Sequence, residues 1–262
     1  MRYGFIGLGN MASAIIRGAI ASGAVAAEDV FGYNHHIEKA EALSRTCGMR
    51  VCESLAALAA KSDFIVLAVK PQVLPDVLPK LKAHVAGKRI VTIAAGKTLE
   101  YYEAALGEIP VIRVMPNINA VVGASTSCIC ANAHASEADV AQVRALFEAV
   151  GSVTEIPEAH FSVFGSVAGC SPAYTFMYID ALARAGVRAG LSRKVAQQAA
   201  ASAVMGSARM ALESNEHPQA LADKVCSPGG STIEGLYALQ LGGFEGLVQQ
   251  AIAAAIEKSA KL

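Results

Sequence analysis

The sequence of 262 residues lacks an excess of either charge, and this absence limits its partners before any motif is considered. Lys and Arg together number 22, as do Asp and Glu, so the formal net charge at pH 7 is zero. A protein that binds nucleic acid through its phosphates needs a basic surface to displace counterions. We therefore expect no nucleic-acid partner, and any anionic ligand must be held by local geometry.

Long apolar runs are absent as well. Hydrophobic residues make up 53% of the chain, yet no stretch reaches the roughly 18 uncharged apolar residues that a membrane span needs. Arg17 interrupts the apolar N-terminal stretch, which argues against a signal peptide. Only 17% of residues are charged, against roughly 25% in an average soluble chain, and so apolar a composition excludes a disordered chain. We expect a globular protein without a membrane span.

The cysteines lack the spacing of a metal or redox site. No CxxC pair occurs, and no histidine lies nearby as a zinc co-ligand. Scattered free thiols inside an apolar core are typical of a reducing compartment, so we expect a cytoplasmic protein with no metal centre. The six cysteines are Cys47, Cys52, Cys128, Cys130, Cys170 and Cys226.

Strand-like and helix-like segments alternate over the first part of the chain. The apolar run 2–8 ends in glycines, and apolar residues then recur from Ala12 to Ile20 at helical spacing. Such alternation predicts an α/β domain, residues 1–156, with a doubly wound parallel sheet covered by helices on both faces. Further strands are expected at 30–33, 63–69, 89–94, 111–115, 126–131 and 153–156.

Strand signals vanish beyond residue 156, where Ala-rich helical stretches take over. We expect helices at 171–188, 192–213, 231–241 and 244–261, which form an all-helical domain over residues 157–262. Several of these helices are apolar almost all round, and so few helices cannot bury every face within one chain. This favours a homodimer or larger oligomer built on the helical domain; helices packed within a monomer are the alternative.

A dinucleotide-binding turn follows the first expected strand. It reads G-x-G-x-x-A and opens the first helix, which is the context that the Rossmann-like fingerprint requires. Gly7 makes the tight turn, Gly9 lets the pyrophosphate approach the backbone, and Ala12 allows close helix packing. Free N–H groups at the helix start then bind the phosphates; a purely structural turn is the alternative. The residues are Gly7, Leu8, Gly9, Asn10, Met11 and Ala12.

The end of the second expected strand indicates which dinucleotide is bound. NAD enzymes place Asp or Glu there on the ribose 2′-hydroxyl, whereas this chain has Asn34. Without a carboxylate to repel it, a 2′-phosphate is tolerated, and Asn34, His35, His36 and Lys39 could donate hydrogen bonds to it. NADPH is therefore the favoured cofactor, with NADH as the alternative. A solvated helix start explains the histidines equally well; if they bind the phosphate, its affinity weakens as the pH rises from 6 to 8.

A second anion cradle is predicted near the C-terminus. A Ser-Pro-Gly-Gly turn at 227–230 leads Ser231 and Thr232 into a new apolar helix. Backbone N–H groups and hydroxyls would converge at this helix start and suit a small carboxylate. An ordinary serine cap after a glycine turn is the alternative interpretation.

Five motifs in matching order resemble pyrroline-5-carboxylate reductases over essentially the whole chain. They are the turns 7–12 and 227–232, the strand end Ala68-Val-Lys-Pro-Gln72, Arg113-Val-Met-Pro-Asn117 and Ser171-Pro-Ala-Tyr174. The resemblance implies an enzyme that reduces 1-pyrroline-5-carboxylate to L-proline with NAD(P)H, in the last step of proline biosynthesis. It also implies a homodimer formed through the helical domain.

The resemblance assigns roles to residues. It implies that Ser227, Gly229, Gly230, Ser231 and Thr232 hold the substrate, with the Thr232 hydroxyl as catalytic group beside the ring nitrogen. Ala68, Val69, Lys70 and Pro71 would line the adenosine side of the cofactor, and Asn117 would lie near the nicotinamide. Lys70 as a solvent-facing charge is the alternative for that residue.

Three segments depart from the family pattern. Ile118 and Asn119 replace the usual Thr-Pro, and this removes a hydroxyl near the cofactor. Ala168-Gly-Cys-Ser171 replaces the usual Ser-Gly-Ser-Gly, which leaves the contacts there open. His35 stands where a basic residue is common, which weakens the assignment of NADP.

The chemistry is compatible with these residues. The nitrogen of a cyclic imine can take up a solvent proton before reduction, so no strongly acidic side chain is needed. A 3-hydroxyacid dehydrogenase, whose sequence begins in the same way, would need a catalytic lysine within 162–184, and none occurs there. A dinucleotide-sensing module is the non-enzymatic alternative, but a sensor would not need the second cradle.

Overall fold

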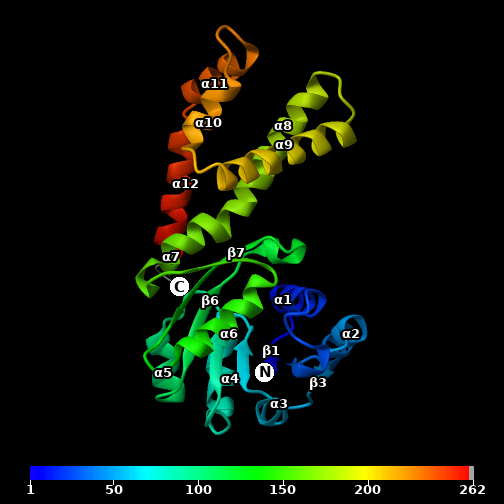
Figure 1. The fold of residues 1–262 in the computed structure, drawn as a ribbon, viewed down its shortest axis with the longest axis vertical. Coiled ribbons are helices and arrows are strands. Elements are labelled where there is room, and N and C mark those ends of the chain that lie inside the picture. The colour runs from blue at the N-terminus through cyan, green and yellow to red at the C-terminus, as the bar shows by residue number, and fades with distance from the viewer. Residues whose placement is uncertain (260–262) are drawn as a thin grey trace. The chain divides into compact units, whose positions relative to one another are not determined.

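The computed structural model describes residues 1–259, which divide into two compact units (Figure 1). The first unit comprises Met1–Gly169 together with residues 256–259, and the second comprises Cys170–Ala255. The sequence predicts a domain boundary between residues 156 and 157, and this boundary stays a prediction. The first compact unit extends beyond it, to Gly169.

The first unit contains an eight-stranded sheet with strand order β3-β2-β1-β4-β5-β6-β7-β8. Every neighbouring pair is parallel except β6 and β7. The strands are β1 (Tyr3–Ile6), β2 (Val30–Tyr33), β3 (Arg50–Val51), β4 (Phe64–Leu67), β5 (Arg89–Thr92), β6 (Val111–Met115), β7 (Ser125–Ala131) and β8 (Gly151–Glu155).

Two hydrophobic clusters cover the two faces of this sheet. Successive side chains of a strand point to opposite faces, and accordingly Phe5 belongs to one cluster and Ile6 to the other. Helices α1 (Asn10–Ala21), α2 (Ile37–Cys47) and α6 (Glu137–Glu148) contribute to the first cluster. Helices α3 (Leu55–Lys61), α4 (Leu74–Lys82) and α5 (Leu99–Leu106) contribute to the second. The predicted doubly wound α/β fold is confirmed.

Two strand features differ from the expectation. The two-residue strand β3 is too short for hydrophobic periodicity to reveal it. Strand β7 runs antiparallel to β6 because only the short 3₁₀ turn η3 (Ile118–Val122) connects them. A parallel return would need a crossover of about a dozen residues or more.

Short helical turns complete the first unit. Of these, η1 (Ala27–Asp29) lies between α1 and β2, and η2 (Pro71–Val73) lies between β4 and α4. After β8 the chain forms η4 (Glu158–His160), α7 (Phe161–Phe164) and the π-helical segment η5 (Gly165–Cys170). The segment between β8 and the long helices is therefore helical rather than extended.

The second unit is made of helices alone among its described residues. These are α8 (Ser171–Arg188), α9 (Arg193–Glu213), α10 (Pro218–Val225), α11 (Ser231–Leu241) and most of α12 (Phe244–Ser259). Helices α8 and α9 form an antiparallel pair around the buried Ala183, Ala196 and Ala200. Sequence analysis missed α10 because Pro218 reads as a breaker; the proline instead occupies the first turn, where its missing N–H is tolerated.

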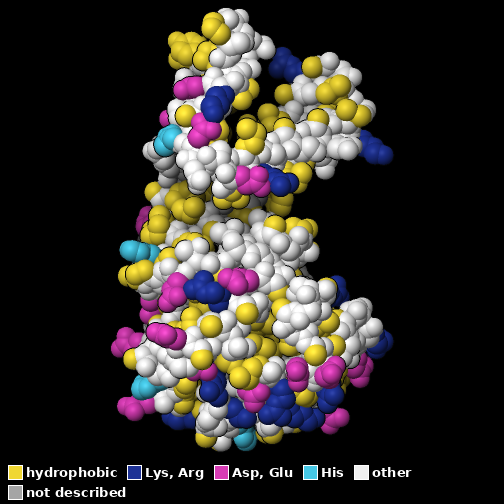
Figure 2. Space-filling model, in the orientation of Figure 1, with side chains coloured by type: hydrophobic (Ala, Val, Ile, Leu, Met, Phe, Trp, Pro, Cys, Tyr) yellow, Lys and Arg dark blue, Asp and Glu magenta, His cyan; other side chains and the backbone are white. Residues whose placement is uncertain are grey.

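The helical unit leaves large apolar side chains uncovered. Met177 is 74% exposed on α8 and Leu212 is 84% exposed on α9. Tyr237 and Leu241 on α11 and Leu247 on α12 are exposed as well, and Figure 2 shows hydrophobic side chains over this part of the chain. Within residues 1–259, no helix has both the length and the apolar character to cross a membrane. So much exposed apolar surface indicates that a protein partner covers it.

Candidate functional site

The turn after β1 has a backbone that only glycine tolerates well. Gly7 has φ +91°, and a Cβ there would lie 2.8 Å from Cγ1 of Val69 and 2.9 Å from the carbonyl oxygen of Ala68. The Gly7 N–H donates to the carbonyl of Tyr33 at 2.9 Å. This turn is therefore clamped between β2 and the end of β4, which brings it to the carboxyl ends of the parallel strands.

The helix start that follows suits a phosphate. Gly9 is the N-cap of α1, no side chain caps the helix, and no acidic residue occupies its first turn. A Cβ added at Gly9 would meet no atom within 4 Å, so the backbone there is open to a ligand. Ala12 is buried against the sheet. The free N–H groups and the positive end of the helix dipole together fit a pyrophosphate.

A cleft of about 680 Å³ opens beside this turn. The turn at residues 7–9, called the nucleotide turn below, lines the cleft. The end of β2 and the start of α4 line it as well. Pro71, Asn10 and Met11 do not line it, although they follow lining residues in the chain. The predicted residues that it brings together are Gly7, Leu8, Gly9, Asn34, His35, His36, Lys39, Ala68, Val69 and Lys70. An elongated ligand that starts at Gly9 therefore has a continuous path to Asn34.

Asn34 performs a structural task that the sequence did not reveal. Its Oδ1 accepts from the Leu8 N–H at 3.1 Å, and its Nδ2 donates to the carbonyl of His36 at 3.0 Å. The side chain thus ties the nucleotide turn to the start of α2. Both ends of the amide make intramolecular bonds, and a role of Asn34 in cofactor binding stays a prediction.

Asn117 is likewise engaged in structure. The residue is buried, its Oδ1 accepts from the N–H groups of Asn119 and Thr126, and its Nδ2 donates to the carbonyl of Ala168 at 2.9 Å. Asn119 can donate because it replaces the proline expected from the family pattern, and proline has no N–H. Asn117 does not line the cleft beside Gly7; its place near the nicotinamide stays a prediction.

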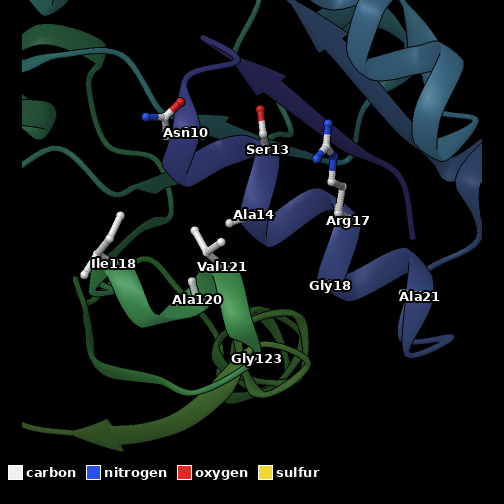
Figure 3. Close-up of a pocket in the computed structure, with 10 residues that line it drawn as sticks. All are labelled: Asn10, Ser13, Ala14, Arg17, Gly18, Ala21, Ile118, Ala120, Val121 and Gly123. Carbon is white, nitrogen blue, oxygen red and sulfur yellow. The ribbon is translucent and has the colours of Figure 1, made fainter. Parts of the chain in front are cut away.

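A second cavity of about 640 Å³ lies between α1 and η3. Asn10, Ser13 and Arg17 line it from α1, while Ile118 and Val121 line it from η3 (Figure 3). Val121 points toward Ala14, and its side chain is 63% exposed. Because Asn10 begins the helix that Gly9 caps, this cavity adjoins the nucleotide turn and has one apolar wall.

The Ser-Pro-Gly-Gly turn forms an uncapped helix start in the second unit. Gly229 has φ +68°, and the Gly230 N–H donates to the carbonyl of Ser227 at 3.0 Å. Gly230 is the N-cap of α11 and no side chain caps the helix, so the ordinary serine cap is not what the structure has. Ser231 and Thr232 occupy the exposed first turn. Free N–H groups and two hydroxyls therefore gather there, as a small carboxylate would require.

Two charged residues of the cleft beside Gly7, called the cofactor cleft below after the role proposed for it, were missed by the sequence analysis. Asp76 and Lys80 line it from α4 together with Val77, and Val73 lines it from the end of η2. Their separations of three, four and seven residues place them on one helix face. The helical spacing after the strand end at Val69 was the signal that could have found them.

The buried cysteines of the sheet are unreactive. Burial raises the pKa of the thiols of Cys128 and Cys130 to about 12 each. A thiol with so high a pKa carries almost no thiolate near neutrality and is a poor nucleophile. Cys128 and Cys130 are free and buried, so their role in this unit is packing.

A phosphate-binding turn on a doubly wound sheet, followed along the chain by a helical unit with a second uncapped helix start, defines a dinucleotide-dependent oxidoreductase. Comparison with known proteins agrees. Residues 158–262 match the family model for pyrroline-5-carboxylate reductase dimerisation, and residues 2–96 match the model for NADP oxidoreductase, coenzyme F420-dependent.

Full-length relatives and solved structures narrow the class. The chain is 42% identical over 263 aligned positions to the pyrroline-5-carboxylate reductase of Escherichia coli (strain K12), covering 100% of this chain and 98% of that protein. The crystal structure of Plasmodium falciparum pyrroline carboxylate reductase with NADP bound has TM-score 0.91 and 32% identity, covering 100% and 97%. The Streptococcus pyogenes 1-pyrroline-5-carboxylate reductase has TM-score 0.90 and 34% identity, covering 100% and 99%. The chain belongs to the pyrroline-5-carboxylate reductase family.

Proposed function

We propose that this protein reduces 1-pyrroline-5-carboxylate to L-proline with NADPH, with NADH as the alternative cofactor, in the last step of proline biosynthesis. The observation that carries the proposal is the pair of helix starts at Gly9 and Gly230, which have no side-chain cap and are each preceded by a glycine at positive φ. They occur in a chain that aligns over its full length with reductases of this name. Both ligands are anions, a pyrophosphate and a small carboxylate, and backbone N–H groups suffice for both.

The cofactor residues follow from the geometry of the first unit. Backbone N–H groups from Gly9 to Ala12 would hold the pyrophosphate, and the cleft residues Ala68, Val69 and Lys70 would lie along the adenosine. The proposed cofactor set is completed by Gly7, Leu8, Met11, Asn34, His35, Pro71 and Asn117. NADPH, when bound, supplies the hydride. The chain's part is to fix the cofactor and to exclude competing orientations.

The substrate residues act at the second helix start. Ser227, Gly229, Gly230, Ser231 and Thr232 would bind the carboxylate and the ring, with the Thr232 hydroxyl beside the ring nitrogen. A cyclic imine protonated from solvent is already an activated electrophile, so Thr232 need only accept a hydrogen bond from its N–H or relay a proton. Orientation of the imine carbon then supplies most of the rate enhancement.

The reaction is tested by mixing purified protein with NADPH and pyrroline-5-carboxylate and following the loss of reduced-nicotinamide absorbance. We expect consumption that depends on the imine, and no oxidation of hydroxyacids with NADP. Thr232→Ala should lower turnover by about 10-fold or more while NADPH binding, followed by fluorescence, stays intact. Thr232→Ser should retain most activity because it keeps the hydroxyl. No consumption with the cyclic imine would refute the proposed reaction, and unchanged turnover in Thr232→Ala would remove Thr232 from the mechanism.

We also infer a homo-oligomer built on dimers through the helical unit. The exposed apolar side chains of α8, α9 and α11 support this, as does the match of residues 158–262 to a dimerisation model. Sedimentation should give at least the mass of a dimer, and Met177→Glu should lower it. A wild-type monomer at micromolar concentration would contradict the inference. We place the protein in the cytoplasm, where free thiols persist; cell fractionation tests this.

A further inference from the structure

We propose that Lys80 and Lys39, which both line the cofactor cleft, together bind the 2′-phosphate of the cofactor and so determine the preference for NADPH over NADH. The inference rests on the proposed use of a nicotinamide cofactor. It adds Lys80, from an element distant in the sequence, to Lys39 and the other residues after the second strand that the sequence analysis considered for this phosphate.

The cleft has lysines on the two sides of β1. Lys39 on α2 follows β2, Lys80 on α4 follows β4, and these two strands flank β1; both lysines line the cleft. Val73 and Val77 lie on the same helix face as Lys80, at positions i, i+4 and i+7. An adenine ring packed on the two valines would therefore lie in the cleft that both lysines line.

The lysines of the cleft are free to bind an anion. Among residues 1–259, the side chains of Lys39, Lys70 and Lys80 make no ion pair or hydrogen bond. Asp76 is the single acidic side chain among the lining residues. Three ammonium groups against one carboxylate leave the cleft with a positive excess, which a phosphate group would neutralise.

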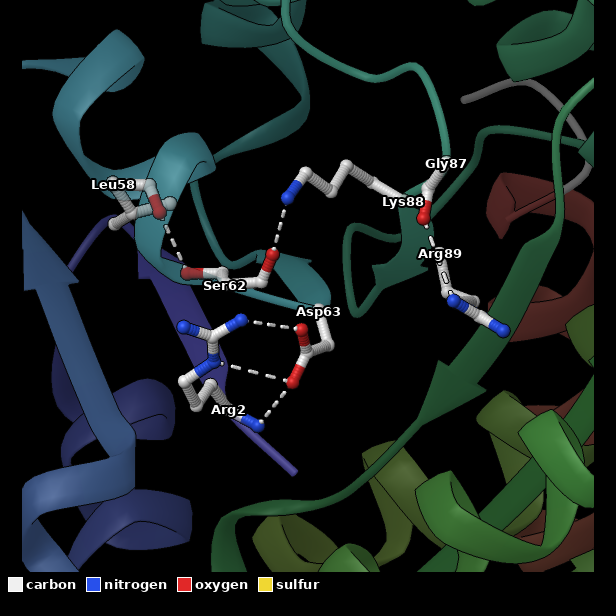
Figure 4. A network of polar contacts seen from close by, with 7 residues as sticks. All are labelled: Arg2, Leu58, Ser62, Asp63, Gly87, Lys88 and Arg89. Atoms are coloured by element: carbon white, nitrogen blue, oxygen red, sulfur yellow. Dashed lines mark hydrogen bonds and ion pairs between the residues drawn. The ribbon is translucent and has the colours of Figure 1, made fainter.

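Basic residues at the opposite end of the strands are engaged in structural contacts instead. Arg2 pairs with Asp63 at 2.9 Å, Lys88 donates to the carbonyl of Ser62 at 2.8 Å, and Arg89 pairs with Asp139 at 2.7 Å. Figure 4 shows the contacts of Arg2 and Lys88. These residues lie at the starts of β1 and β5, whereas the cleft lies at the strand ends. The three lysines of the cleft differ from these residues in that, within the described part of the chain, they make no such structural contact, and they line a cavity.

The 2′-phosphate is the anion that fits these lysines. The pyrophosphate has the uncapped start of α1 at Gly9, where no Lys or Arg is present among residues 7–12. The Asn34 amide already bonds Leu8 and His36, which leaves at most one N–H of its Nδ2 for a second phosphate, so cationic side chains supply the further donors that a phosphate needs. A 2′-phosphate carries a charge of about −1.5 to −2 near pH 7 and has three acceptor oxygens, enough for both lysines.

The test measures nucleotide binding and needs no turnover. Calorimetric titrations at pH 8, where an ordinary histidine is mostly neutral, compare adenosine 2′,5′-bisphosphate with 5′-AMP, which lacks only the 2′-phosphate. Lys80→Gln and Lys39→Gln should each weaken bisphosphate binding about 3- to 10-fold, as expected for one exposed charged hydrogen bond. Binding of 5′-AMP should stay within about 2-fold. Asp76→Asn should change bisphosphate binding in the opposite direction.

Lys82→Gln is the matched control, because Lys82 lies on the same helix and does not line the cleft. It should leave both affinities unchanged, and Lys80→Arg should restore bisphosphate binding. Equal weakening by Lys80→Gln and Lys82→Gln, or equal weakening of both nucleotides by Lys80→Gln, would overturn the proposal. The titrations measure nucleotide binding and do not depend on turnover. A protein that fails to reduce the imine would therefore refute the proposed function, but not the assignment of the 2′-phosphate to these lysines.

Discussion

The Asn34→Asp variant separates the two tasks that the end of β2 can perform. Aspartate has nearly the same shape and keeps an oxygen for the Leu8 N–H, which Oδ1 of Asn34 accepts at 3.1 Å. It loses the Nδ2 donor to the His36 carbonyl and places a negative charge beside the cleft. NADH can donate its ribose hydroxyls to such a carboxylate, whereas the 2′-phosphate of NADPH is repelled by it.

The size of the discrimination follows from Coulomb's law. A carboxylate and a 2′-phosphate of charge about −1.5, about 6 Å apart at an effective dielectric constant of about 40, repel by about 2 kcal/mol. This is about a 30-fold loss of NADPH affinity relative to NADH. In the variant, a carboxylate oxygen replaces Nδ2, which lies 3.0 Å from the His36 carbonyl oxygen. Two oxygens then face each other, which should lower stability by about 1–3 kcal/mol whichever cofactor is bound.

The ratio of the two dissociation constants is therefore the diagnostic quantity. Fluorescence titrations of NADPH and NADH give it, and urea unfolding measures the loss of stability. Asn34→Ala is the matched control, since it removes both hydrogen bonds without adding a charge and should weaken both cofactors alike. If Asn34→Asp weakens NADPH and NADH by the same factor, the cofactor's 2′ position does not lie near Asn34 and the reasoning fails.

Two further predictions concern the first unit. Gly7→Ala should lower the free energy of unfolding by about 1–3 kcal/mol and weaken nucleotide binding, because the new Cβ adds both strain at positive φ and a clash with Val69. Gly23→Ala at φ +77° adds strain without a clash, so an equal loss in both variants by urea unfolding would show that the contact with Val69 is unimportant. The side-chain hydrogen bond from Arg2 lowers the pKa of the Asp63 carboxyl (Figure 4), so this pair stabilises the fold above about pH 4 and loses its effect as the pH falls further. The difference in melting temperature between wild type and Asp63→Asn should therefore shrink below about pH 4; a difference that stays constant down to pH 2 would contradict this origin.

Local sequence patterns predicted elements of secondary structure. Helices α8 and α11 have the bounds that the sequence analysis predicted for them, 171–188 and 231–241. Helical spacing and flanking turn residues are short-range signals, so they can be read from one segment. The same holds for the nucleotide turn, because the strain at Gly7 and the open backbone at Gly9 are properties of consecutive residues.

Contacts between distant segments could not be predicted in this way. The bond from Leu8 to Asn34 and the bond from Asn117 to Ala168 join residues 26 and 51 positions apart. Sequence analysis predicted cofactor contacts for both asparagines, which stay predictions; it did not reveal that their amides also tie loops together. Only the folded structure shows which group each of these amides bonds, because many possible partners are chemically equivalent in the sequence.

The neutral charge balance, the two glycine turns and the succession of an α/β domain and long helices were determined by the sequence alone, because each depends on composition or on neighbouring residues. Tertiary structure decided the antiparallel return of β7, the tasks of Asn34 and Asn117, and the meeting of Lys39 with Lys80 in one cleft. Parallel strands bring their carboxyl ends to one edge of the sheet, and that edge gathers side chains whose separation in the sequence gives no sign of their proximity.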